Sequence, residues 1–420
     1  MYSVRFPLIL TGIIILAVMN WRCAEDPIDV DLSHLSQTPD TLTLKDITGF
    51  TYQVPPEIGS IKRLYTGAKD DLFFPFTFIK IHSLDGANSI SWESLLDTAI
   101  TVDSILFKLY SNDSLISPDI DIHLYFSTDS IFSEGESNYL DYQSFSFADW
   151  IDLDRPDISQ VTDTTDSSEF FKETVLSWEI STLMSTLADT TDSNLVRTFG
   201  IGFPEGGPWP EYSDSSFLNI FSREYSPGEQ DPKIEVYYRQ EMYVATESSP
   251  VDTLMKTFYA VGDVSIVFQD NIYDTLPGEI VISRGKGLRA IVDVPFDSLS
   301  LPELSVIRSA KLILHQVADT TNSFGIKMDP LNEIIDTSET VFDNDPFSEL
   351  GVYSTSSSIV DGKFEISLKS FLQSILMVDT LKNVGMKLSS GLSSDLFETA
   401  RFDLLSESNS ARVEILYVAP

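Results

Sequence analysis

Short segments of alternating apolar and polar residues set the tightest limit on how this chain can fold. They are rich in β-branched and aromatic residues, and a period of two with that composition is typical of half-buried β-strands. Clusters of Ser, Thr, Asp, Asn and Gly separate them and favour turns. Helical spacing occurs in short stretches, at 181–187 and 367–376. The clearest strand-like segments are 105–110, 120–126, 233–238, 311–314 and 412–417.

The same landmarks recur in the same order in the two halves of the chain. Each half has a strand-like segment that contains Glu-Ile-Ser and runs into its short helical stretch, at Glu179 and at Glu365. Ordered recurrence indicates two copies of one domain. We therefore expect an all-β fold of two tandem β-sandwich, jelly-roll-like domains, each with one short helix. The other matching segments are 73–81 with 288–296, 101–110 with 305–314, 198–203 with 383–388, and 233–238 with 412–417.

The N-terminal part has a different character. A basic start at Arg5 precedes a largely apolar run from 6 to 19, which is the layout of a bacterial secretory signal. The run is shorter than the roughly 20 residues that span a bilayer. The residues after it are acidic and interrupted by prolines. The expected segments are a signal peptide or membrane anchor at 1–22, an acidic tether at 23–58, a first β-sandwich at 59–240 and a second at 241–420.

Cys23 is the single cysteine of the chain, and it follows the apolar run as the acylated cysteine of a bacterial lipoprotein does. The residues before it, Asn20, Trp21 and Arg22, are bulkier than a lipoprotein signal usually has. Three interpretations stay open: lipidation at Cys23, an uncleaved anchor, or cleavage elsewhere with release. The expected location is the bacterial cell envelope, at the outer membrane or cell surface through a lipid, with a secreted or periplasmic protein as the alternative.

The order of the landmarks resembles the DNRLRE-type jelly-roll domain of bacterial surface and secreted proteins. The pattern has a Ser-Ala-Lys-Leu strand, found here at Ser309–Leu314, and a closing Ser-Arg-Glu element, found at Ser222–Glu224 before the strand at 233–238. In the first half of the chain, Asp103–Leu106 stands where the pattern has Ser-Ala-Lys-Leu. In the second half, Ser406 and Glu407 stand where it has Ser-Arg-Glu, so the Arg is missing. The resemblance implies an accessory module that binds glycans or builds surface layers.

The charge balance excludes several classes of function. The chain has 27 Lys and Arg against 64 Asp and Glu, a formal net charge of −37. Nucleic-acid binding needs a basic surface, so that partner is excluded. One cysteine excludes a disulfide framework and a multi-thiolate zinc site. Since 11% of the residues are aromatic, the chain is not a disordered acidic polymer.

No catalytic motif with a known mechanism occurs in the sequence. It lacks His-Glu-x-x-His, Gly-x-Ser-x-Gly and a phosphate-binding glycine loop, and its four histidines are scattered. We therefore expect a protein that is not an enzyme and has no cofactor, with Ca²⁺ as the one metal to consider, because acidic turns offer the oxygen ligands that it prefers. The candidate metal ligands are Asp119, Asp121, Asp343 and Asp345.

The segment 200–212 is the most unusual in composition, because glycines and prolines surround its aromatic residues. Trp209 and Tyr212 next to Glu205 and Glu211 would suit a sugar, whose C–H face packs on a ring while its hydroxyls meet carboxylates. The alternative is a loop whose aromatics cover the edge of the core. Trp150 and Trp178 lie in strand-like patterns and are expected in the core.

These observations predict a non-catalytic cell-envelope lipoprotein that acts as a surface binding module, with a glycan as the candidate ligand. One alternative is a glycan-active enzyme or its accessory subunit. Another is a structural component of a surface or secretion assembly. The expected partners are the membrane, through an N-terminal lipid or anchor, and a polysaccharide or an envelope protein.

Overall fold

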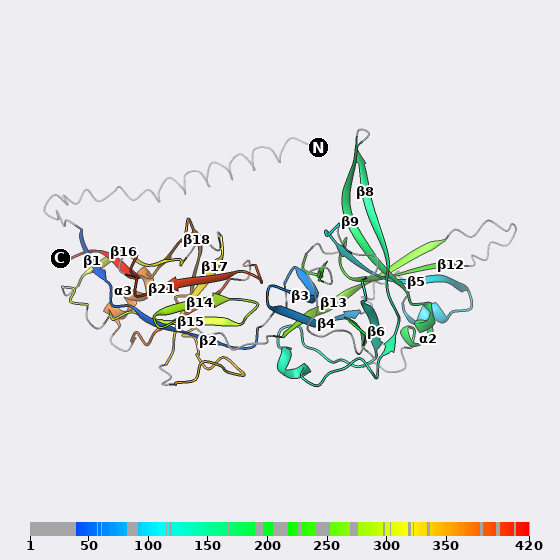
Figure 1. Ribbon diagram of the computed structural model, residues 1–420, viewed down its shortest axis with the longest axis horizontal. Coiled ribbons are helices and arrows are strands. Elements are labelled where there is room, and N and C mark those ends of the chain that lie inside the picture. Colours follow the sequence, from blue (N-terminus) through cyan, green and yellow to red (C-terminus); the bar gives the residue numbers. More distant parts are fainter. Residues whose placement is uncertain are drawn as a thin grey trace, which may run out of the picture.

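A computed structural model of the chain confirms the all-β fold and shows two lobes side by side (Figure 1). Among the described residues, no helix is both long and apolar enough to cross a membrane. The structure describes residues 39–56, 58–59, 61–81, 91–114, 116, 120–165, 168–189, 196–204, 217–225, 229–240, 253–268, 276–296, 299–302, 304–317, 321, 323–333, 337–378, 381–391, 395–406 and 409–419.

The lobe that we call the first unit is a curled antiparallel sheet, with the order β7-β6-β10-β4-β13-β12-β5-β9-β8 and with β3 between β4 and β11. Its short helix α2 spans Met184–Leu187 and follows the 3₁₀ turn Ser181–Leu183; two further turns are Glu93–Leu96 and Tyr139–Tyr142. The strands are β3 Arg63–Lys69, β4 Leu72–Ile81, β5 Ile100–Ser111, β6 His123–Ser127, β7 Ile151–Asp152, β8 Asp157–Thr165, β9 Ser168–Glu179, β10 Arg197–Gly202, β11 Leu218–Phe221, β12 Lys233–Gln240 and β13 Leu254–Phe268.

The second unit repeats this plan, with the order β1-β22-β16-β19-β18-β17-β20-β15-β14-β21 and with β2 beside β15. Its helix α3, Lys369–Met377, packs against β16 and buries Phe371 and Leu372. The strands are β1 Asp40–Leu44, β2 Thr48–Gln53, β14 Glu279–Ser283, β15 Leu288–Asp293, β16 Val306–His315, β17 Gly325–Pro330, β18 Thr355–Val360, β19 Lys363–Ser367, β20 Met386–Ser390, β21 Thr399–Asp403 and β22 Arg412–Val418.

The two units correspond strand by strand. The triplet β12-β5-β9 matches β22-β16-β19, and the pair β4-β10 matches β15-β20. Between β12 and β4 the first unit places β13, whereas between β22 and β15 the second unit places β1 and β2. The strands β1 and β2 precede the first unit in the sequence, yet they belong to the second unit. The strand β13 opens the second repeat of the sequence, yet it belongs to the first unit. Each repeat has thus exchanged its leading strand with the other.

This exchange changes the expected division of the chain. The range 23–58, expected as a tether, contains β1 and β2, and the expected join at 240 lies inside the first unit. Among the described residues, the first unit runs from about 58 to 268, and the second combines 39–56 with 276–419. The repeat pattern misses this, because strand signals are local whereas the choice of pairing partner is not.

Each unit has its own sandwich core. In the first unit Trp178, Phe107 and Phe199 are fully buried, and Trp178 donates a hydrogen bond to the Asp154 carbonyl (3.0 Å). In the second unit Phe364 and Phe402 are fully buried. Trp178 therefore lies in the core as expected.

A connection covers the outer face of the sheet in each unit. In the first unit residues 131–150, here named the first cover, lie over β4, β10 and β13. Its aromatic rings pack on Phe76 and Phe78, and Trp150, which was expected in the core, is partly buried in this cluster. In the second unit residues 341–350, the second cover, pack through Phe342 and Phe347 on the sheet.

The two glycines of β10 make room for the first cover. A Cβ atom on Gly200 or Gly202 would overlap the ring of Phe147. This contact explains the glycines at the start of the unusual segment 200–212 by packing.

We expect Gly202→Val to push Phe147 off the sheet and lower the free energy of unfolding by about 2 kcal/mol, the usual cost of overpacking. Urea denaturation measures the loss, and near-ultraviolet circular dichroism reports the displaced rings. Gly135→Ala is the matched control, since a Cβ atom there meets no atom within 4 Å. Equal stability of the two variants would contradict this account.

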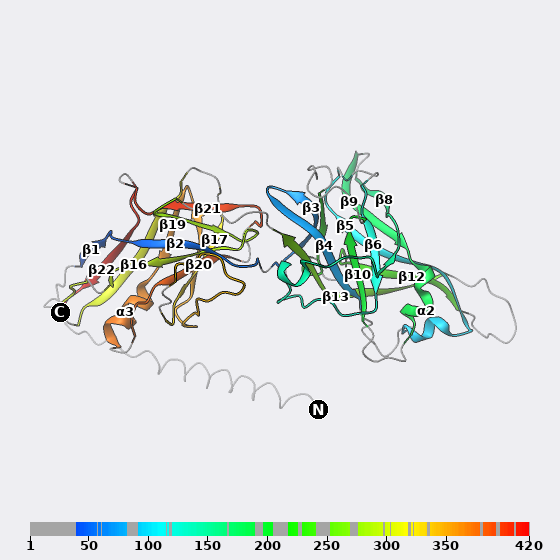
Figure 2. The same cartoon turned by 60° about the horizontal axis from the view of Figure 1, so that its bottom comes forward.

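The units meet through a small apolar cluster. Phe397 of the second unit lies 5.3 Å from Tyr65 and 6.0 Å from Phe74 of the first, between ring centroids. Leu396 is buried in the same cluster with Leu72. Figure 2 shows the same lateral arrangement of the lobes from a second direction.

Candidate functional site

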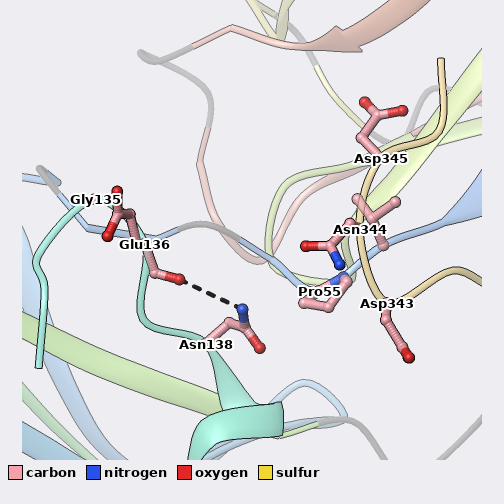
Figure 3. Close-up of a pocket in the computed structure, with 8 residues that line it drawn as sticks. Pro55, Gly135, Glu136, Asn138, Asp343, Asn344 and Asp345 are labelled. Atoms are coloured by element: carbon pink, nitrogen blue, oxygen red, sulfur yellow. Dashed lines mark hydrogen bonds between the residues drawn. The ribbon is translucent and has the colours of Figure 1, made fainter. Parts of the chain in front are cut away.

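A polar pocket of about 200 Å³ lies where the two covers and the connection between the units come together. The first cover contributes one wall, the second cover contributes the opposite wall, and the connection after β2 forms the floor (Figure 3). Pockets at the junction of two domains are common ligand sites. The lining residues are Val54, Pro55, Gly135, Glu136, Asn138, Asp343, Asn344 and Asp345.

The wall from the first cover is fixed by local hydrogen bonds. The Asn138 side chain accepts from the Leu140 N–H (2.9 Å), and the Asp141 carboxylate accepts from the Asn138 N–H (3.1 Å). This is a capping box at the start of a 3₁₀ turn. The Asn138 amide also donates to the Glu136 carbonyl at 3.4 Å. These bonds hold the backbone of the wall, and Glu136 lies on it.

The wall from the second cover is fixed by Asp345. Its carboxylate accepts from the Lys387 ammonium (3.0 Å), the Tyr52 hydroxyl (3.1 Å) and the Phe347 N–H (3.0 Å), and it pairs with Arg289. Burial opposes ionisation, but the hydrogen bond from Lys387 and the charge of Arg289 outweigh it and lower the pKa of Asp345. Asp345 therefore holds the second cover on the sheet and is not free to bind a ligand.

Asp343 and Asp345 point to opposite sides of the second cover, and the Asn344 amide projects from between them (Figure 3). Both Asp343 and Asn344 are exposed. The pocket thus offers amide groups, which donate and accept, and carboxylate oxygens, which accept. It is smaller than the roughly 300 Å³ of a typical ligand site. It suits one small polyhydroxylated group better than a large apolar ligand.

A second cluster of carboxylates lies next to this pocket. Glu134 of the first cover, Glu224 after β11 and Asp263 of β13 each place an oxygen within 4.8 Å of the other two. Burial raises the pKa of Asp263 well above its usual value, and it also raises the pKa of Glu134. Among the residues described, this is the one group of three or more acidic, His or Cys side chains close enough to share a metal ion.

The predicted site residues have different outcomes. Asp343 and Asp345 both line the pocket, although Asp345 is engaged in ion pairs. Asp121 lies 2.6 Å from Arg155 and 3.8 Å from His123, so its partners are side chains of the chain itself. The other candidates fall outside the described residues: Cys23, Asp119, Glu205, Trp209, Glu211 and Tyr212.

Nothing in the sequence points to Asn138, Asn344 or the cluster of Glu134, Glu224 and Asp263. An acidic signal marked 343–345, but nothing local paired it with the first cover. Glu224 lies in the Ser-Arg-Glu element that carried the family resemblance. Its partners come from sequence positions far away, and only the fold brings them together.

Comparison with protein-family models gave no match to the chain, and a search of curated proteins gave none either.

Proposed function

We propose that this chain is a non-catalytic binding module of the bacterial cell envelope, and that it holds a glycan group in the pocket between its units. The observation that carries the proposal is the lining: Asn138 and Asn344 on opposite walls, with Asp343 beside them. Amides and carboxylates are the side chains that bond sugar hydroxyls, because they supply donors and acceptors in fixed directions.

The sequence supports the location and the class. The apolar run before Cys23 is typical of an exported chain, and Cys23 would supply a lipid attachment. The resemblance to DNRLRE-type domains favours an accessory role at the surface. A strongly acidic surface keeps such a protein soluble and argues for a neutral glycan.

The test is retention of the purified chain on an array of neutral polysaccharides. Replacing Asp343 and Asn344 by Ala should weaken binding at least about tenfold, because two exposed hydrogen-bonding groups of the pocket are lost. Asn409→Ala is the matched control, since Asn409 is exposed and lies outside the pocket. Unchanged binding by the double variant would remove the pocket from consideration.

A second function has one observation in its favour. Glu136 and Asp343 both line the pocket from different walls, and glycoside hydrolysis uses two carboxyl groups. The same samples should be assayed for the release of reducing ends. Release that is lost in both Glu136→Gln and Asp343→Asn would replace the binding proposal by an enzymatic one.

A further inference from the structure

Five large apolar side chains of the second unit are exposed at one place, and we name them the apolar patch. Leu376, Met377 and Val378 lie at the end of helix α3, and Leu304 and Val306 lie where β16 begins. Between 40% and 85% of each residue is exposed to solvent. Apolar surface in water is unfavourable, so the patch needs an explanation outside the core of the unit.

The path of α3 along β16 brings the two segments of the patch together. The Ala310 carbonyl of β16 accepts a hydrogen bond from the residue before α3 (2.8 Å), and the Ile307 N–H donates to the Gln373 side chain (2.7 Å). The helix therefore runs toward the residue at which β16 starts. Met377 lies one turn beyond Gln373 on the same face of α3, and this turn reaches the level of Val306. The exposed side chains of both segments thus form one surface.

The backbone at Leu304 is strained in a way that keeps this side chain outside. Its φ angle is 63°, in the left-handed region that bulky residues rarely adopt. The residue is also 85% exposed, so burial of the side chain does not offset the strain. Strained residues occur preferentially at functional sites. The conformation of Leu304 therefore favours a contact of the patch with something outside the chain.

The place where the N-terminal part of the chain joins the second unit indicates what the patch contacts. Asp40, the first residue of β1, pairs with Tyr417, which pairs in turn with Ile307 at the start of β16. The patch therefore lies next to the point where the part of the chain that contains the apolar run and Cys23 enters the unit. Both α3 and the start of β1 lie at the end of the second unit that faces away from the first unit (Figures 1 and 2). The chain between Cys23 and Asp40 spans at most about 60 Å, so a membrane that holds Cys23 is within reach of the patch.

We propose that the apolar patch docks on the surface of a lipid bilayer, in addition to the attachment through the N-terminal part of the chain. Apolar side chains on such a face enter the boundary between headgroups and acyl chains to a depth of about 5–10 Å. The net charge of −37 disfavours anionic lipids, so the surface that fits is zwitterionic. Attachment raises the concentration of the patch at the bilayer, and a contact that is weak by itself then suffices. This inference rests on the envelope location in the proposed function and does not depend on the glycan.

The experiment compares the oxidation of two methionines in the full chain, free in solution and attached to vesicles. Cys23, the single cysteine, is coupled to a maleimide lipid in phosphatidylcholine vesicles, which reproduces attachment at this residue. Hydroxyl radicals then oxidise exposed methionines, and mass spectrometry measures the sulfoxide at each position. Attachment should slow the oxidation of Met377 at least about twofold, because the side chain leaves the water. Met255 of the first unit is the matched control: it is 55% exposed, lies outside the patch and should react at the same rate in both samples.

A variant separates docking from mere proximity to the vesicle. Leu304→Ser together with Val306→Ser removes apolar surface from the patch and keeps the attachment at Cys23. Both residues are exposed, so the variant should stay folded, which circular dichroism checks. On vesicles, its Met377 should be oxidised at the rate of the free chain.

The proposal is overturned if attachment leaves the oxidation of Met377 unchanged, or if the double variant is protected as well as the unmodified chain. It is also overturned if Met377 reacts more slowly than Met255 in the free chain. Met377 is the more exposed of the two, at 75%, so slow oxidation would mean that a second copy or another segment of the chain covers the patch. The glycan array uses the chain without vesicles, and fractionation of cells tests the envelope location. The failure of this inference and the failure of the proposed function are therefore distinguishable.

Discussion

Deletion of residues 40–53 should unfold the second unit, more than 200 positions away in the sequence, and leave the neighbouring first unit folded. These residues form β1 and β2, which pair with β22 and β15 and close the second sandwich. The deletion removes two fully buried side chains, Ile47 and Tyr52, and the Thr51 hydroxyl that accepts from the Val281 N–H (2.8 Å).

The expected loss is as large as the stability of a typical domain. Burial of Ile47 and Tyr52 contributes about 2 kcal/mol each, and the backbone pairing of two strands is lost in addition. Domains have about 5–15 kcal/mol in total. Hydrogen exchange with mass spectrometry should show fast exchange throughout residues 276–419 and protection in 61–240.

The reciprocal variant is the control. Val264→Asp, in β13, should raise hydrogen exchange in the first unit and leave protection in the second unit unchanged, because Val264 is buried in the first unit. A synthetic peptide of residues 39–56 added to the deletion variant should restore protection in the second unit. Loss of protection in the first unit after the deletion of 40–53 would refute the strand exchange.

Asp345→Ala should release the second cover from its sheet. The substitution leaves Lys387, whose side chain is 5% exposed, with Glu349 as its remaining carboxylate at 2.8 Å, and it removes the carboxylate that pairs with Arg289. Breaking a fully buried ion pair typically costs 3–5 kcal/mol; we expect about 2 kcal/mol here, because the pairs are partly buried and Glu349 remains. Urea denaturation measures the loss, and hydrogen exchange should locate it in 341–350.

The dependence on pH identifies the cause. In the folded state the pKa of Asp345 and that of Glu349 are lowered, so their ionised forms contribute stability above pH about 4. That contribution is lost as the pH falls below the unfolded pKa and through the folded one. The difference between wild type and Asp345→Ala should therefore shrink at acid pH. Asp343→Ala, two residues away and exposed, should leave the stability unchanged; an equal loss there would contradict the assignment to the ion pairs.

The strands and their repetition could be predicted from the sequence, because alternation is written into each segment. Val413 and Ile415, both buried, with the exposed Glu414 between them, show this alternation. The partners of β1 could not be predicted: its sequence, Asp-Thr-Leu-Thr-Leu, is mostly exposed in the fold and gives a weak signal. Each of the two sheets has a place where a leading strand can pair, and the pattern of β1 alone does not show which sheet it joins.

The candidate site, too, could be predicted from the sequence only in part. Asp343 and Asp345 could be selected as an acidic turn, but their different roles depend on Lys387 and Arg289, which reach only Asp345. Gly202 stands in the first unit where the repeat has Lys387 in the second. The first sheet therefore contacts its cover through the ring of Phe147, and the second through the partly buried ion pairs of Asp345. Neither contact can be predicted before the positions of the covers are known.

The strand exchange has a mechanical consequence. In a chain attached to a surface through residues before 39, the C-terminal unit stands at the base and the first unit at the tip, in reverse of the sequence order. Tension between the attachment and the first unit would run along β1 and β2. Their hydrogen bonds lie across the direction of pull, so both ladders, to β22 and to β15, would share the load at once. The second unit would then hold both loaded strands, β1 through β22 and β2 through β15.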